Sequence, residues 1–248
     1  ILFLGFSAMD WMIHDYGPYS QEIMDACIKL DSYLGDFIQY VDREVGLENV
    51  MFVLTADHGG LPLPEYLINQ GEKAGRIKKN ILSEALDWID EEIEEKFGKN
   101  LYVRNGVNFF IDSKILKKSE AEFSDIYGIV EKYLLRVEGI ERIISKNSIL
   151  ESSAQDKISR RLKNMLHPQK SADIFPLVSP NYLYKTPYGT SHGTPYDYDT
   201  HVPLIFSQKH FKFNSIDFPS ETVDIAATIA RLLKVEIPSA CDGNPLDI

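Results

Sequence analysis

Apolar runs bounded by turn residues predict that the chain starts with a strand, a long helix and a second strand. Residues 1–7 are almost all apolar, which predicts a strand buried on both faces. Apolar residues then recur every three or four positions over residues 23–41, which predicts a helix capped by Ser20. The next apolar run, residues 49–55, predicts another buried strand. Strand, helix and strand at this spacing are typical of a βαβ unit, so we expect an α/β fold with a mostly parallel sheet flanked by helices.

The pattern changes after Gly59 and Gly60. An α+β region is predicted there, with helices at 75–97, 120–137 and 153–165, strands at 101–112 around a turn at Asn105-Gly106, and a strand at 139–144. The first pattern resumes with strands at 172–178 and 202–207 and a helix at 221–233. We therefore expect a core domain made of residues 1–60 and 171–248, interrupted by an insert subdomain made of residues 61–170.

Charge and hydropathy exclude some classes of function. The 248 residues carry a formal charge of −11 at pH 7, whereas nucleic acids and anionic membrane surfaces favour basic proteins. No apolar run approaches the length that spans a bilayer. We therefore expect neither a nucleic-acid partner nor a membrane segment in this chain. A phosphate-bearing substrate is compatible with the negative charge, because a bound metal ion reverses the local potential.

The two cysteines and the first residues do not identify a cellular compartment. Cys27 lies on the apolar stripe of the long predicted helix, so we expect a buried thiol there, and a disulfide with Cys241 is left open. The chain begins at Ile1, inside a strand pattern, and shows no signal-peptide core. We interpret it as a fragment whose N-terminal part is missing.

Two pairs of side chains are candidates for metal ligation. Asp10 and His14 are four positions apart, and a helical turn places such residues on one side. Asp57 and His58 directly follow the strand predicted at 49–55. Ligands of open parallel sheets collect beyond the carboxyl ends of the strands, so both side chains are expected to face a crevice.

His192 is the fifth candidate ligand. It lies in a loop between Gly189 and Gly193, which can bring a ligand from a distant part of the sequence. Carboxylates and imidazoles without a thiolate are typical of hydrolytic zinc centres. The five residues together therefore predict one or two zinc ions.

Other polar residues near these segments have simpler interpretations. Asp15 adjoins His14 but faces about 100° away on a helix, so we expect it to support the site or face solvent. His201, just before a strand, is a less favoured ligand candidate. His167 and His210 are expected at the surface, and Asp197 and Asp199 in turn and hydrogen-bonding roles rather than as metal ligands.

The order of these motifs resembles the alkaline phosphatase superfamily. The segments are Asp-x-x-x-His with a following Gly-Pro, then Thr-Ala-Asp-His-Gly-Gly, then His-Gly-Thr-Pro-Tyr. They are most similar to the branch of bacterial alkaline phosphatases and type I phosphodiesterases/nucleotide pyrophosphatases, and the resemblance covers the C-terminal part of that fold. It implies two zinc ions, one held by Asp10, His14 and His192 and the other by Asp57 and His58. The family completes the second site with an early Asp and a nucleophilic Thr or Ser, both expected upstream of residue 1.

The resemblance implies a zinc-dependent hydrolase of phosphate esters, with a small-molecule phosphate ester as substrate. Monoester and diester preference are both left open, as is the oligomeric state. Thr55 and Ser7 do not match the family's nucleophile motif, so no catalytic residue is expected in this chain and the isolated fragment is expected to be inactive. Members of this branch are usually exported, which implies a periplasmic or secreted location.

Two alternatives are left open. The first is another chemistry of the same superfamily, that of a sulfatase or a phosphomutase. The second is a degenerate relative that retains the ligands but has no catalytic role.

Overall fold

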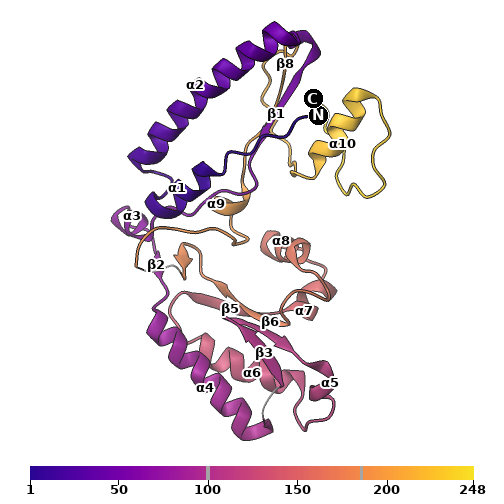
Figure 1. Cartoon of the computed structure of the whole chain (residues 1–248). Helices are drawn as coiled ribbons and strands as arrows, with labels where there is room; N and C mark the ends of the chain where they lie inside the picture. The colour runs from indigo at the N-terminus through magenta and orange to yellow at the C-terminus, as the bar shows by residue number, and fades with distance from the viewer. Residues whose placement is uncertain (99–100, 185–186) are drawn as a thin grey trace. The chain divides into compact units, whose positions relative to one another are not determined.

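The computed structural model describes residues 1–98, 101–184 and 187–248 (Figure 1). The chain divides into two compact units, each of which is described by itself. The first unit contains Ile1–Ala26 and Gly59–Thr200, and the second contains Cys27–His58 and His201–Ile248. The long helix α2 (Gln21–Glu44) contains the boundary between them. As predicted, Ser20 caps this helix, because its Oγ accepts a hydrogen bond from the Ile23 amide at 3.3 Å.

A four-stranded antiparallel sheet forms the centre of the first unit, with the order β3-β4-β6-β5 (Figure 1). Its strands are β3 (Tyr102–Asn105), β4 (Asn108–Ile111), β5 (Ile140–Ser145) and β6 (Ile174–Val178). The tight turn between β3 and β4 is the one predicted from Asn105-Gly106, where Gly106 has a φ of +59°. Pro176 lies beyond the single pairing of β4 with β6 at Ile174, so its missing amide breaks no hydrogen bond on that side.

Helices cover both faces of this sheet (Figure 1). Alternate residues of β6 point to opposite faces, so Ile174 and Val178 join one apolar cluster, and Phe175 and Leu177 join another. The first cluster includes the apolar sides of α4 (Lys79–Phe97) and α6 (Phe123–Leu134). The second includes α7 (Lys146–Glu151) and α8 (Lys157–Met165). Burial on both faces explains why β6 is a continuous apolar run.

The remaining elements of the first unit include those that carry the candidate ligands. They are α1 (Ala8–Tyr16), α3 (Pro64–Asn69), α5 (Ser113–Leu116) and α9 (Asp197–Thr200), with β2 (Gly75–Arg76) parallel to β7 (Tyr182–Leu183). Helix α1 ends at Gly17, whose φ of +81° is accessible to glycine at little cost. A Cβ on Gly17 would lie 2.7 Å from the Leu63 side chain, so this turn packs closely against the segment before α3.

The second unit is built around two strands. Strand β1 (Met51–Thr55) pairs antiparallel with β8 (Leu204–Gln208), with Val53 opposite Phe206. A short 3₁₀ helix, η1 (Leu47–Asn49), precedes β1, and helix α10 (Asp224–Leu233) follows β8. The C-terminal tail is tied to α10, because Asp224 accepts a hydrogen bond from the Asn244 amide at 2.8 Å.

The predicted mostly parallel sheet is wrong for the described residues. Residues 1–6 form no strand and are exposed, and β1 pairs antiparallel with β8 instead of lying in a βαβ unit. In the parts of the chain that the structure describes, β2 and β7 are the one parallel pair. The chain is thus a mixed α/β protein with small, mostly antiparallel sheets. An apolar run predicts a strand, but it does not determine whether the neighbouring strand is parallel or antiparallel to it.

Two predictions of burial are also wrong. Strands β1 and β8 are half-exposed rather than buried, with Leu54 49% and Ile205 51% exposed. Cys27 is exposed, and Cys27 and Cys241 are both free thiols. Among the described helices, none combines the length and hydropathy that crossing a bilayer requires.

Candidate metal centre

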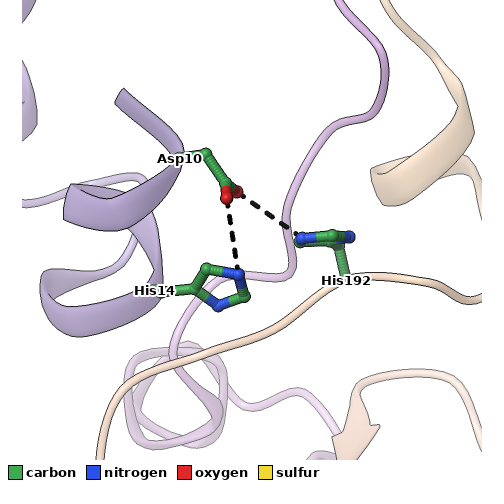
Figure 2. Close-up of side chains that lie close together, drawn as sticks. All are labelled: Asp10, His14 and His192. Carbon is green, nitrogen blue, oxygen red and sulfur yellow. Dashed lines mark ion pairs between the residues drawn. The ribbon is translucent and has the colours of Figure 1, made fainter. Parts of the chain in front are cut away.

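Helix α1 carries Asp10 and His14 on one side, as their spacing of four predicts (Figure 2). The carboxylate Oδ2 of Asp10 lies 3.6 Å from Nε2 of His14. Asp10 is in the first turn of the helix, a position that the helix dipole favours for an anion, and His14 is in the last turn. One helix therefore contributes a carboxylate and an imidazole to the same small space.

His192 reaches the same space from a distant part of the sequence (Figure 2). Its Nε2 lies 3.5 Å from Oδ1 of Asp10, and its ring centroid lies 5.0 Å from that of His14. One ligand atom from each of the three residues lies within 4.8 Å of the others. Within the described residues this is the one group of three or more histidine, cysteine or acidic side chains that could hold a metal ion.

Contacts with Thr190 fix the imidazole of His14. Nδ1 of His14 lies 2.9 Å from the carbonyl oxygen of Thr190, and a carbonyl only accepts, so Nδ1 carries the proton. In the neutral ring, Nε2 then presents its lone pair toward Asp10. The Thr190 amide donates to the His14 carbonyl at 2.9 Å, and the fully buried Thr190 hydroxyl donates to the Leu61 carbonyl at 2.7 Å. This arrangement is the one that orients metal-binding histidines in proteins.

An arginine fixes the first residue of the loop that carries His192. Nη2 of Arg76, at the end of β2, donates to the carbonyl of Gly189 at 2.8 Å. The same guanidinium binds both carboxylate oxygens of Glu65 on α3, at 2.7 and 2.8 Å. The hydrogen bond from Arg76 lowers the pKa of Glu65 below its ordinary value, which keeps this carboxylate charged. Thr190 and Arg76 support the site, and no spacing pattern in the sequence had singled them out.

The separations of the three side chains are compatible with a metal ion held between them. The distances of 3.5 and 3.6 Å are too long for hydrogen bonds. Two ligands at about 2.0–2.1 Å from a tetrahedral zinc ion lie roughly 3.3 Å apart, close to the observed separations. The side chains are 39%, 26% and 25% exposed for Asp10, His14 and His192. The three side chains thus form a group that could hold a metal ion and that solvent can reach.

Asp57 and His58 belong to the second unit and follow β1, as predicted. Oδ2 of Asp57 lies 3.6 Å from Nε2 of His58, and the His58 amide donates to Oδ1 of Asp57 at 3.2 Å. The Asp57 side chain is 89% exposed and that of His58 is 26% exposed. The two side chains lie side by side, and the role of the pair in a second metal site stays a prediction.

The remaining candidates lie outside the three-residue cluster. Asp197 forms ion pairs with Lys157 at 2.6 Å and Arg161 at 2.8 Å, and their hydrogen bonds lower the pKa of Asp197. It therefore has the polar turn role that the sequence favoured. Exposed positions are found for Asp15, His167, His201 and His210.

Comparison with known proteins identifies the family. The model of the type I phosphodiesterase / nucleotide pyrophosphatase family matches residues 1–202. The chain belongs to this family. It is therefore a member of the alkaline phosphatase superfamily, as its motifs predicted.

Several bacterial proteins of known name are similar to the chain over almost its whole length. Alkaline phosphatase PafA of Elizabethkingia meningoseptica is 29% identical over 99% of this chain, and a calcium-transporting ATPase of Myroides odoratus is 27% identical over 99%. The crystal structure of wild-type PafA matches 96% of this chain with a TM-score of 0.83. The chain spans 45% of the length of each of these relatives.

Proposed function

We propose that this chain forms the metal-binding part of a zinc-dependent phosphate ester hydrolase. The observation that carries the proposal is the convergence of Asp10, His14 and His192 at distances that match the coordination of one ion. Family membership supports the same reaction class, since the family is that of type I phosphodiesterases and nucleotide pyrophosphatases. Either a phosphomonoester or a phosphodiester is a suitable substrate, because both present anionic oxygens to such a centre.

In this proposal, Asp10, His14 and His192 hold one zinc ion, and Asp57 and His58 provide two ligands of a second. Zinc at such a site supplies a Lewis acid for a phosphoryl oxygen. The residues of this chain orient the ligands: Thr190 sets the tautomer of His14, and the partial exposure of all three ligands leaves the centre accessible to a small anion. We further propose that residues 61–170 are the insert expected from the sequence, and that the protein is exported, as bacterial phosphatases often are.

Zinc binding by the 248-residue chain tests this proposal. In a competition titration against a chromophoric chelator, the chain should bind one zinc ion tightly. His14→Ala and His192→Ala should each weaken binding by more than about 100-fold, the upper end of the loss caused by removing an outer partner of a ligand. His210→Ala is the matched control, because His210 is an exposed histidine outside the cluster, and its affinity should be unchanged.

The same titration addresses the alternative of a degenerate relative. A chain that binds no zinc, or whose affinity is unaffected by His14→Ala and His192→Ala, would contradict a retained metal centre. Sulfate esters assayed beside phosphate esters, with the longer natural protein and with and without a chelator, would separate a phosphatase or phosphodiesterase from a sulfatase.

A further inference from the structure

We propose that Asp199 is a positioning residue that holds His192 at the metal centre, an inference that rests on the proposed function. Asp199 lies on α9 and is only 3% exposed. Its Oδ2 accepts two hydrogen bonds from Thr194, one from the amide and one from the hydroxyl, each at 2.7 Å. These two hydrogen bonds hold both the backbone and the side chain of Thr194 at one acceptor, so Asp199 fixes the position of Thr194.

Thr194 is two residues after His192, and the residue between them is Gly193. Gly193 has a φ of +107°, a conformation that glycine adopts readily, and no atom lies within 4 Å of the position of a Cβ. A fixed Thr194 therefore limits the rotations that Gly193 would otherwise allow. Thr190 is held by His14 and Leu61 on the other side of His192, so Asp199 supplies the second of two fixed points around this ligand.

Backbone contacts with Gly59 hold Asp199 in place. Its backbone carbonyl accepts a hydrogen bond from the Gly59 amide at 2.7 Å. A Cβ on Gly59 would lie 2.2 Å from the carbonyl oxygen of Tyr198, so the two backbones are in direct contact. This close approach places the carboxylate of Asp199 at a defined point beside the loop.

The second carboxylate oxygen of Asp199, Oδ1, does not stabilise the fold through a hydrogen bond. Oδ1 is buried and accepts no hydrogen bond from the residues that the structure describes. A buried acceptor without a partner destabilises a fold. Buried unsatisfied groups of this kind are rare, so the burial of this carboxylate is not explained by its own hydrogen bonding alone.

Zinc titration of Asp199 variants in the full 248-residue chain tests the inference. Asp199→Ala should weaken zinc binding about 10- to 100-fold, the range found for partners that orient ligands. Asp199→Asn keeps an acceptor for Thr194 and should restore affinity to within about threefold of the unmodified chain. Equal losses in the Ala and Asn variants would show that the charge, rather than the position of the acceptor, matters, and would overturn the inference.

Two further variants separate this inference from the proposed function and from misfolding. If His192→Ala loses zinc while a folded Asp199→Ala binds it normally, the metal centre stands and the role of Asp199 is wrong. If His192→Ala binds zinc normally, the metal centre itself is wrong. If circular dichroism shows that Asp199→Ala does not fold, Thr194→Val decides: it removes one of the two hydrogen bonds and should weaken binding several-fold, and unchanged affinity would overturn the inference.

Discussion

The four-stranded sheet of the first unit and the two-stranded sheet of the second are made from similar apolar runs but differ in burial. Phe109 on β4 and Ile174 on β6 are both 0% exposed, because helices pack on both faces of their sheet. Leu54 on β1 and Ile205 on β8 are about half-exposed. The comparison shows that an apolar run predicts a strand, whereas its burial depends on the elements that pack against it.

This difference has a consequence for stability. The free energy gained by burying apolar surface scales with the area removed from water, so the four-stranded sheet should contribute most of it. Isolated two-stranded sheets are only marginally stable in water. We therefore expect β1 and β8 to open more easily than β5 and β6.

Core truncation should give the largest effect. Phe109→Ala removes a fully buried ring and should lower the free energy of unfolding by about 3–5 kcal/mol. Leu54→Ala, a truncation in the other sheet, should cost about 1 kcal/mol or less because half of that side chain is already in water. Urea unfolding followed by circular dichroism measures both, and similar losses would show that the two sheets are equally important.

Two ion pairs, one in each unit, test the same comparison with smaller expected losses of stability. Lys146 is 7% exposed, and its Nζ lies 2.7 Å from Oδ1 of Asp173 in the first unit. Lys146→Ala leaves the carboxylate of Asp173, which is 25% exposed, without this partner and should destabilise the chain by about 1–2 kcal/mol. Lys209, paired with Glu48 at 3.1 Å in the second unit, is half-exposed, so Lys209→Ala should give no measurable change. A loss from Lys209→Ala as large as that from Lys146→Ala would contradict this account.

The smallest expected effect is a pH dependence from Glu92, which joins α4 to α6. Hydrogen bonds from Lys132 and Lys96 lower the pKa of Glu92 from 4.5 to about 2. A carboxylate with a lowered folded-state pKa stabilises the fold above the unfolded pKa, and this contribution is lost as the pH falls from about 4.5 to about 2.

Glu92→Gln should therefore reduce stability near neutral pH by about 1 kcal/mol, a value discounted because both lysines are half-exposed. The difference from the unmodified chain should shrink below about pH 4. Glu91→Gln, an exposed neighbour on α4, is the control. A difference between the Glu92 variant and the unmodified chain that grows on acidification would contradict the sign of this shift.

Much of the local structure could be predicted from the sequence. The turn at Asn105-Gly106 depends on residues close in sequence and is confirmed. The helix predicted at 75–97 is confirmed from Lys79 onward, whereas Gly75–Arg76 forms strand β2. The division into residues 1–60 with 171–248 and residues 61–170 stays a prediction. The strand at residues 1–7 and the burial of Cys27 failed because both depend on surfaces supplied by distant residues, which periodicity does not encode.

The candidate site also contains parts that local sequence predicts and parts that depend on long-range contacts. The placement of Asp10 and His14 on one side of a helix follows from the helical repeat alone. The approach of His192 is a long-range contact, and here the order of the motifs and its resemblance to a family supplied what spacing could not. Thr190 was not predicted because it acts through its backbone carbonyl, which any residue type possesses.

Anomalous X-ray scattering at the zinc edge, from crystals of the chain grown with zinc, tests the central claim most directly. The account predicts an anomalous peak about 2.0–2.2 Å from a carboxylate oxygen of Asp10 and from Nε2 of both His14 and His192. A well-ordered Asp10, His14 and His192 cluster with no peak between them, while zinc occupies surface histidines elsewhere, would contradict it.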